Sequence, residues 1–449
     1  MGKKKFEIPV IKRMAYNVPG KAGTQPGVEP LAEIDGIPVS GLLSRHGSPL
    51  FVLSEKTIRQ VYQQARDAFT SRYPNVQFAW SYKTNYLDAV CRIYHQEGSW
   101  AEVVSGFEYD KALNNGVGGK KIIFNGPDKS DADLIKAIEN QSYIHIDHFD
   151  ELFAVIRLSE TSTHKPRVAI RVNMDTGIYP RWDRFGFNYE NGEAMEAIDQ
   201  IMKSGKLELS GLHTHIGTYI MTSNAYQMAT DKMAKLAIKI QNKYHHRIKY
   251  IDMGGGFASM NTLKGAYHNA SDTNPSFDQY AESITGALLR AGFERDHLPV
   301  LILETGRALI DDAGYLAGQV LATKRLADGR KALVLDFGVN LLFTAFWYDH
   351  QLHPVEEVSD TKDEAALFGP LCMNIDVIRE QARVPLLQKG DQVVVSRVGA
   401  YNMTQWMQFI TYRPNVVLID LNGEEHIIRK TESLETILKQ EIIPDHLKS

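Results

Sequence analysis

The sequence predicts an α/β fold: a (β/α)8 barrel plus a C-terminal β-barrel-like domain that the N-terminal segment completes. Three patterns lead to this prediction. From about residue 48 to about residue 305, short apolar runs alternate with helical stretches, which is typical of βα units around a parallel sheet. There are eight such runs, the number of strands in a closed barrel. After about residue 310, apolar runs continue without regular helices between them.

The predicted strands are short apolar runs, and most of them end near a polar residue. In the barrel they are Gln77–Tyr82, Ala101–Ser105, Lys121–Asn125, Tyr143–Asp147, Arg167–Asn173, Glu208–His215, Ile248–Met253 and Val300–Glu304. In the second domain they are Ala332–Phe337, Gln392–Val398 and Val416–Leu421. The charged stretch Asp360–Glu364 predicts a surface loop.

The domain boundaries follow from the change of rhythm along the chain. We expect residues 1–50 to form an N-terminal segment that joins the β-domain, residues 51–308 to form the barrel, and residues 309–449 to form the C-terminal β-domain. A chain of 449 residues is long for one domain, and its 43% of hydrophobic residues suffices for a sizeable core.

Composition and charge exclude several classes of protein. The net charge of −4 argues against a dedicated nucleic-acid binder, which would carry a basic patch. The two cysteines, Cys91 and Cys372, are too few for a disulfide framework or a cysteine-rich zinc site, and they fit a reducing compartment. No apolar run approaches the length of a membrane span, and the basic start lacks the apolar region of a secretory signal. We therefore expect a cytoplasmic protein that binds neither nucleic acid nor membranes.

Lys83 directly follows the apolar run Ala79–Tyr82. A lysine at the end of an apolar strand is costly unless a counter-charge or a reaction requires it. One such reaction is a Schiff base with an aldehyde cofactor, in which a desolvated amine is the nucleophile. The alternative is a lysine that simply extends its amine to solvent.

Further polar or glycine residues lie at or just past the ends of the predicted strands. They are Ser105, Asn125, Asp147, Arg171, His213, His215, Gly254–Gly256, Glu304 and Arg307. In a (β/α)8 barrel the carboxyl ends of the strands meet on one face, which is where the active site lies. We therefore expect these residues and Lys83 to converge on one site.

Two of these motifs suit the recognition of a phosphorylated ring. The backbone N–H groups of Gly254–Gly256 can form a concave anion site, although a plain tight turn is the alternative. Glu304 can hold a pyridine nitrogen protonated, and Arg307 offers a fork for phosphate oxygens. An internal ion pair between Glu304 and Arg307 is the alternative.

His213 and His215 lie on the same side of a predicted strand, a spacing compatible with zinc. No third ligand with matching spacing stands out, so we expect no metal and keep zinc as the alternative. The ring of His215 could instead stack on a flat cofactor, with the Thr218 hydroxyl reaching its phosphate.

In the second domain, Cys372 lies on a loop that begins with Gly369-Pro370 and also contains Asp376. It is either a small buried hydrophobe or a proton donor or nucleophile. Tyr401 follows Gly399-Ala400 and either adds a hydroxyl to a phosphate shell or packs into the core.

Taken together, the motifs resemble the alanine-racemase-like (fold type III) pyridoxal-phosphate enzymes, in particular the diaminopimelate and ornithine decarboxylases. The motifs occur in the family's order: Ser81–Asn85, His215–Thr218, Gly254–Gly256, Glu304–Arg307 and Cys372–Asp376. The resemblance extends from Gly47 to Tyr401. It implies a (β/α)8 barrel, a β-domain, pyridoxal 5′-phosphate as cofactor, an amino acid as substrate, and a homodimer with shared active sites.

The resemblance also implies roles for individual residues. Lys83 would form the Schiff base, with Glu102 near it where the family usually has an aspartate; Arg171 would lie near the ring hydroxyl and His215 on the ring face. Glu304 would bind the ring nitrogen, with Thr305 in place of the family's proline. The phosphate shell would contain Thr218, Gly254, Gly255, Gly256, Arg307 and Tyr401. Cys372 of a partner subunit would act on the reacting carbon.

The substrate end departs from the family in this sequence. Met373 stands where diaminopimelate decarboxylases carry a glutamate for the distal amine, in the stretch that ends at Asp376. Thr344-Ala345 replaces the Arg-Pro that holds the distal carboxylate, whereas Tyr348 and Asp349 resemble the ornithine decarboxylase pattern. We therefore expect Tyr348, Asp349, Met373 and Asp376 to bind a diamino or modified amino acid.

Three functions remain open, and decarboxylation is favoured. Racemases of this fold typically place an arginine at the ring nitrogen and a catalytic tyrosine in the second domain, so Glu304 argues for carboxylate loss. A racemase or another lyase on the same fold is the first alternative. A cofactor-binding protein without turnover is the second.

Overall fold

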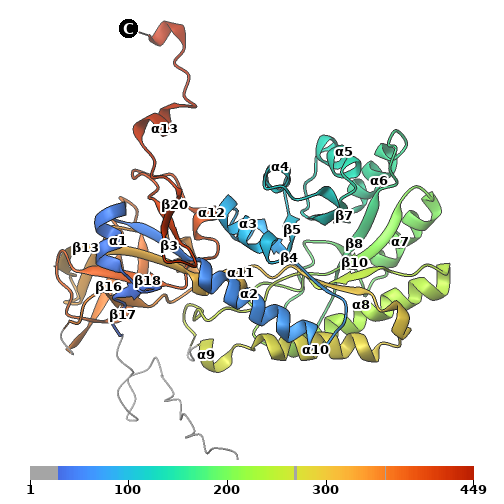
Figure 1. The fold of residues 1–449 in the computed structure, drawn as a ribbon, viewed down its shortest axis with the longest axis horizontal. Helices are drawn as coiled ribbons and strands as arrows, with labels where there is room; N and C mark the ends of the chain where they lie inside the picture. Colours follow the sequence, from blue (N-terminus) through green and yellow to red (C-terminus); the bar gives the residue numbers. More distant parts are fainter. Residues whose placement is uncertain (1–28, 267–269, 359–360, 449) are drawn as a thin grey trace, which may run out of the picture.

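The computed structural model describes residues 29–448 except 267–269 and 359–360. Figure 1 shows two adjoining bodies, a barrel surrounded by helices and a smaller β-rich body, with a C-terminal arm that leaves the second body. Among the described helices, none combines the length and the apolar character needed to cross a membrane.

The first body is a closed parallel barrel, so the predicted fold class is confirmed. Its strands are β4 (Val76–Ser81), β5 (Trp100–Val103), β6 (Ile122–Phe124), β7 (Tyr143–Ile146), β8 (Arg167–Asn173), β10 (Glu208–His213), β11 (Tyr250–Asp252) and β12 (Val300–Leu303). Neighbouring strands pair in parallel, and the pairings β12–β4 and β10–β8 close the ring. The short strand β9 (Phe187–Asn188) extends the sheet beside β8.

Helices connect these strands and cover the outside of the barrel (Figure 1). The longer ones are α2 (Glu55–Thr70), α3 (Asp88–Gln96), α4 (Gly106–Asn114), α5 (Asp131–Glu139), α6 (Phe149–Leu158), α7 (Glu193–Ser204), α8 (Ser223–Tyr244) and α10 (Phe277–Arg290). Serine residues begin four of them, since Ser54, Ser105, Ser130 and Ser276 each accept a hydrogen bond from a backbone N–H of the first turn. Ser105, a predicted site residue, therefore has a capping role in α4.

The remaining helical turns lie in the connections. They are η1 (Tyr82–Thr84), η2 (Gly119–Lys121), α9 (Ala270–Thr273), η3 (Arg295–His297), α11 (Arg307–Ile310), η4 (Asp311–Ala313), η5 (Phe343–Phe346) and α12 (Asn402–Gln405). The C-terminal arm contains α13 (Leu434–Leu438) and η6 (Asp445–Leu447). Lys83 lies in η1 and Arg307 begins α11, so both follow directly on barrel strands.

The second body is a sheet built around one long strand, β13 (Gly314–Arg325), which pairs with β3, β14 and β18 at different points along its length. Its other strands are β3 (Leu50–Ser54), β14 (Lys331–Leu335), β15 (Leu352–Pro354), β16 (Lys362–Phe368), β17 (Val377–Pro385), β18 (Gln392–Ser396), β19 (Val416–Ile419) and β20 (Glu425–Arg429). A hairpin of β1 (Glu33–Ile34) and β2 (Ile37–Pro38) and the helix α1 (Val39–His46) precede β3.

Two predictions about this body need correction. The predicted barrel start at residue 51 lies inside β3, which pairs with β13 and β19 of the second body. The physical reason is that all five β3 residues are buried and need strand partners, and the closed eight-stranded barrel has no free edge to offer them. The predicted loop Asp360–Glu364 is wrong from residue 362, where β16 begins and pairs with β17. Backbone pairing tolerates charged side chains there, because Asp363 and Glu364 lie at an exposed strand end. Asp360 lies outside the described residues.

The described part of the N-terminal segment packs on the second body. The N–H of Leu31 donates to the carbonyl oxygen of Pro354 at 2.8 Å, and Val39 and Leu42 of α1 join an apolar cluster with Leu50 of β3. Residues 1–28 of the predicted segment lie outside the described residues.

Candidate active site

The interior of the barrel changes from apolar to polar toward the carboxyl ends of the strands. Alternate residues of a strand point inward. One layer of inward side chains is largely apolar and contains Ala79, Trp100, Ile123, Tyr143, Ala169, Tyr250 and Ile302. Two residues further along the same strands the inward positions carry Ser81, Glu102, Asn125, His145, Arg171, His213, Asp252 and Glu304. The barrel therefore gathers its ionisable groups at the carboxyl end, the usual location of active sites in this fold.

Lys83 extends into this polar layer. Its Nζ lies 2.6 Å from Oε2 of Glu102, a fully buried carboxylate that also accepts a hydrogen bond from the Ser81 hydroxyl at 2.5 Å. Burial opposes the charge of the amine, but Glu102, Tyr401 and Glu304 outweigh it and raise the pKa of Lys83 above its ordinary value. The lysine side chain keeps 38% of its surface exposed, so the amine remains accessible.

The second body fixes the turn that carries Lys83. The hydroxyl of Thr404 donates to the carbonyl oxygen of Lys83 at 3.0 Å, and the N–H of Tyr401 donates to the carbonyl oxygen of Thr84 at 2.8 Å. The side-chain amide of Asn85 donates to the carbonyl oxygen of Gly399 at 3.1 Å. Each residue from Lys83 to Asn85 thus bonds to the 399–404 segment.

Glu304 follows β12 and faces the same layer. Its Oε1 accepts a hydrogen bond from Asn125 Nδ2 at 2.6 Å, and its Oε2 lies 3.4 Å from Nε2 of His213. The same Asn125 nitrogen lies 3.0 Å from Oε1 of Glu102, so one amide joins the two carboxylates. Burial and the charge of Arg171 hold the pKa of His213 well below its usual range, which leaves its imidazole neutral.

The glycine triplet comes so close to neighbouring backbone that side chains are excluded. A Cβ at Gly255 would lie 2.6 Å from the carbonyl oxygen of Glu304, and one at Gly256 would lie 2.2 Å from that of Gly217. Gly254 and Gly256 also have φ values of 65° and 96°, a region that favours glycine. The loop therefore places bare backbone beside Glu304.

Arg307 is a buried cation that forms no salt bridge within the part of the chain that the structure describes, although the carboxylate of Asp311 acts on it electrostatically. It lies among the rings of Tyr219, Trp347, Tyr348 and Tyr401, with its guanidinium carbon 4.7 to 5.8 Å from their centroids. It donates hydrogen bonds to the hydroxyls of Tyr348 and Thr218. In the described part of the chain it forms no salt bridge, so the alternative of an ion pair with Glu304 is not supported there; Glu304 lies beside His213 instead. A buried guanidinium in this state favours an anionic ligand.

His215 and Arg171 line the other side of the layer. Nδ1 of His215 accepts a hydrogen bond from the N–H of Gly255 at 3.1 Å, and its ring lies 5.4 Å from that of Trp182. Burial, with the charges of Arg171 and Lys83, lowers the pKa of His215 well below its usual value. Arg171 lies 3.6 Å from Asp147.

The zinc alternative is not supported in its predicted form. No group of three potential ligands in the described part of the chain contains both His213 and His215. His213 instead groups with His145 and Glu304, whose donor atoms lie within 4.8 Å of one another.

The predicted substrate residues lie in different surroundings. Asp376 is 3% exposed and accepts backbone hydrogen bonds from Val339 and Leu371 at 2.8 Å each, so it fixes its loop. Cys372 on that loop is exposed, and Met373 packs in part against the main core. Neither position tests substrate binding, so the substrate roles of Met373 and Asp376 stay predictions.

Tyr348 is one of the aromatic residues around Arg307, and Asp349 follows it in the chain. Tyr348 is buried against Arg307, and Asp349 accepts a hydrogen bond from the N–H of Gly265 at 3.2 Å and lies 3.9 Å from Arg379. Thr344, where the family places its distal-carboxylate contact, is buried and bonded to His350 and Asn402. Its hydroxyl is thus occupied within the chain.

Sequence reasoning missed Ser81, His145, Asp252 and Trp182 as neighbours of the site. The first three could have been found by counting alternate positions back from the strand ends, because they share the inward face of their strands. Trp182 lies in a loop with no periodic pattern, so it carried no comparable signal.

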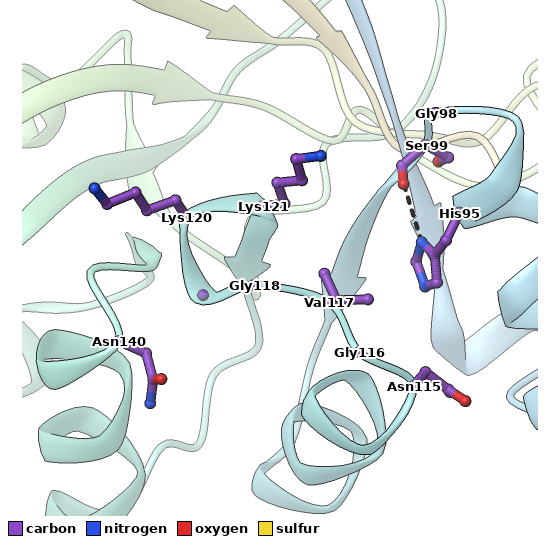
Figure 2. A pocket seen from close by; sticks show the side chains of 11 residues that line it. His95, Gly98, Ser99, Asn115, Gly116, Val117, Gly118, Lys120, Lys121 and Asn140 are labelled. Carbon is purple, nitrogen blue, oxygen red and sulfur yellow. Dashed lines mark hydrogen bonds between the residues drawn. The ribbon is translucent and has the colours of Figure 1, made fainter.

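A hollow lies at the opposite end of the barrel from the polar layer. It has a volume of about 620 Å³ and lies before β5, β6 and β7, at residues that include His95, Ser99, Asn115, Lys121 and Asn140 (Figure 2). Figure 2 shows the hydrogen bond of 2.9 Å between His95 Nδ1 and the carbonyl oxygen of Ser99. The other nitrogen of His95 lies 2.9 Å from the hydroxyl of Tyr82. Because its lining residues precede β5, β6 and β7, the hollow lies apart from the polar layer at the carboxyl ends of the strands.

Comparison with known proteins identifies the class. The family model described as "Pyridoxal-dependent decarboxylase, pyridoxal binding domain" matches residues 55–311, more than half of the chain. The chain belongs to this family of pyridoxal-dependent decarboxylases, and it is a carboxy-lyase that uses pyridoxal phosphate. The residues fit the cofactor, because the accessible amine of Lys83 and the buried guanidinium of Arg307, which forms no salt bridge among the described residues, lie in the same polar end of the barrel.

Individual relatives align with this chain over almost its whole length. The diaminopimelate decarboxylase of Methanocaldococcus jannaschii is 28% identical over 431 residues, which are 92% of this chain and 95% of the relative. That of Bacillus subtilis is 27% identical over 427 residues, 91% and 95% of the two chains. The crystal structure of the M. jannaschii enzyme aligns with a TM-score of 0.85 at 27% identity, covering 93% of this chain and 97% of that one.

Proposed function

We propose that the protein releases CO2 from a diamino acid or a modified amino acid, using pyridoxal 5′-phosphate bound to Lys83. The observation that carries this proposal is the 2.6 Å contact between the accessible amine of Lys83 and the buried Glu102 at the carboxyl end of the barrel. When bound, the cofactor supplies an aldehyde for Schiff bases and a ring that withdraws electrons from the reacting carbon.

The chain's own residues would orient the reaction. Glu102 can accept the proton that Lys83 must lose before its nitrogen becomes a nucleophile. Glu304, held by Asn125, would face the ring nitrogen and favour its protonated form. His215 would cover the ring face, and Arg171 would lie near the ring hydroxyl.

The phosphate would be bound by the cation and the bare backbone beside it. Arg307 forms no salt bridge with any described residue, and the glycine triplet offers close approach without side chains. Thr218 and Tyr401 would complete the shell, since Thr218 bonds to Arg307 and the ring of Tyr401 lies 4.7 Å from it.

We propose a homodimer in which Cys372 of one subunit completes the site of the other. The exposure of Cys372 and its place outside the barrel support this arrangement. Tyr348, Asp349, Met373 and Asp376 remain the proposed substrate residues. The free thiols of Cys91 and Cys372 support the proposed location in the cytoplasm.

The relatives' names suggest the substrates to test first. Purified protein with pyridoxal phosphate would be assayed for CO2 release from meso-diaminopimelate, both enantiomers of lysine, ornithine, arginine and several carboxylated diamines. Lys83→Ala serves as the control. Release from one compound, absent in the variant, is the expected result. A change of chirality without CO2 would replace the proposal by racemisation, and silence with bound cofactor would leave a non-catalytic binding protein.

A further inference from the structure

Three side chains of the polar layer come together as a candidate metal site. The donor atoms of His145 on β7, His213 on β10 and Glu304 after β12 lie within 4.8 Å of one another. Nε2 of His213 lies 3.4 Å from Oε2 of Glu304, and two ligand atoms on a tetrahedral zinc ion are separated by about 3.4 Å. Two imidazoles and one glutamate are a ligand set that zinc enzymes use, with a fourth position left open.

Most ring nitrogens of the two histidines are not engaged within the described residues. Both histidines are 1% exposed. In the described part of the chain, neither nitrogen of His213 has a hydrogen-bond partner, so its 3.4 Å contact with Glu304 lacks the geometry of a hydrogen bond. Nδ1 of His145 is likewise unpartnered there, and its Nε2 lies 2.9 Å from the hydroxyl of Tyr250. Buried polar atoms without partners are costly, and imidazole nitrogen is the commonest metal ligand in proteins.

The charges of the polar layer also favour a cation at this place. Lys83 contacts Glu102 at 2.6 Å, and Arg171 contacts another carboxylate at 3.6 Å. Glu304 and Asp252 are buried as well, but among the described residues neither forms a salt bridge with a lysine or an arginine. Buried carboxylates are strongly destabilising unless a cation or a proton compensates them. A divalent ion bound to Glu304 would supply that charge.

The donor types decide which ion fits. Imidazole nitrogens suit zinc and its transition-metal neighbours, whereas magnesium and calcium prefer oxygen ligands. The cluster offers two imidazoles and one carboxylate, so it favours zinc. An ion can reach the layer from solvent, because the side chain of Lys83 keeps 38% of its surface exposed.

We propose that the protein without cofactor binds one Zn²⁺ through His145, His213 and Glu304, and that this ion and the cofactor exclude each other. The exclusion rests on the proposed function, in which Glu304 faces the ring nitrogen of the cofactor. Oε1 of Glu304 already accepts a hydrogen bond from Asn125 at 2.6 Å, so Oε2 is the oxygen left for either zinc or the ring. His145 has no role in the proposed cofactor site, so it allows the zinc site to be tested separately.

The first test is a calorimetric titration of the cofactor-free protein with Zn²⁺, which does not depend on the enzyme's activity. We expect one ion per chain. Its affinity should be at least about tenfold lower in His145→Gln, because losing a residue that merely orients a metal ligand already costs about 10–100-fold. His213→Gln should show the same loss and replaces His145→Gln if that variant does not fold.

The matched control is His426→Gln, which changes a second group of possible metal ligands on the surface, Asp420, Glu424 and His426. This variant should bind zinc with the affinity of the wild type. Equal affinity in the wild type and His145→Gln would overturn the proposal, because zinc would then bind elsewhere. Absence of zinc binding in the wild type would overturn it too, and protons would then compensate the buried carboxylates.

The second test measures the competition, by titration with pyridoxal phosphate at a fixed zinc concentration. At about ten times the dissociation constant of zinc, the apparent dissociation constant of the cofactor should rise about tenfold in the wild type. In His145→Gln it should stay within about twofold of its zinc-free value, and this variant also controls for zinc that binds the free cofactor. Equal effects of zinc on both proteins would overturn the exclusion. Failure of the proposed function would appear differently, as absence of CO2 release from the wild type without zinc.

Discussion

The hydroxyl of Thr404 donates a hydrogen bond of 3.0 Å to the backbone carbonyl oxygen of Lys83. The donor lies after β18 in the second body, and the acceptor lies in the turn that follows the first barrel strand. The position of Lys83 over the polar layer therefore depends on the second body as well as on the barrel.

Thr404→Val removes this hydrogen bond while keeping the side-chain shape. We expect a loss of about 1 kcal/mol of stability, the usual net value of one such bond, and weaker cofactor binding. Urea unfolding and cofactor titration would measure both effects. The control is Thr70→Val on α2, whose hydroxyl bonds only within its own helix. Unchanged cofactor affinity in Thr404→Val would show that the barrel alone positions Lys83.

Asn125→Ala removes the amide that joins Glu102 to Glu304. Both carboxylates would lose a buried donor, at a cost of about 1–3 kcal/mol each, so cofactor affinity should fall at least tenfold. Asn115→Ala, at the far end of the barrel beside the hollow of Figure 2, is the control. Equal cofactor affinity in both variants would refute a role for the bridging amide.

Gly255→Ala places a Cβ 2.6 Å from the carbonyl oxygen of Glu304, and backbone must move to accommodate it. We expect lower cofactor affinity, since both the phosphate loop and Glu304 shift. Gly118→Ala is a matched control, because Gly118 has a φ of −65° and open space around it. Cofactor titration of folded variants would test the difference, and an unchanged affinity in Gly255→Ala would speak against a phosphate at this loop.

Glu108 is expected to make stability depend on pH. Burial, then the charge of Glu102, raise its pKa to about 7, against an ordinary value of 4.5. The native state thus holds an extra proton between these values, and stability falls as pH rises through them, by up to about 3 kcal/mol. Glu108→Gln keeps an acceptor for the N–H of Val104, and its stability relative to the wild type should increase as the pH rises over this range. Parallel stability curves from pH 4.5 to pH 8 would contradict the raised pKa.

The barrel could be predicted because its strands are short apolar runs separated by helices, and these runs match the eight barrel strands closely; the short β9 was not predicted. The second body was harder to predict, since β13 changes partners along its length and β16 begins with charged residues. Neither feature has a local apolar pattern. The role of β3 was missed because pairing with β13 and β19 joins segments far apart in the sequence.

In the candidate site, too, features with a local sequence pattern could be predicted, and contacts between distant segments could not. Lys83, Glu304 and Arg307 were predicted from strand ends and from family motifs, and the structure places all three beside carboxyl ends of strands. The hydrogen bond from Asn125 to Glu102 could not be predicted, because it depends on the register of the adjacent strands β5 and β6. The hydrogen bond from Thr404 to Lys83 depends on how the two bodies pack, which no local pattern encodes.

The most direct test of the central claim is to locate the lysine that binds the cofactor. Protein loaded with pyridoxal phosphate would be reduced with borohydride, digested, and analysed by mass spectrometry. The account predicts that the modified peptide contains Lys83. Modification of another lysine, such as the fully buried Lys129 that pairs with Glu151, or of none, would contradict it.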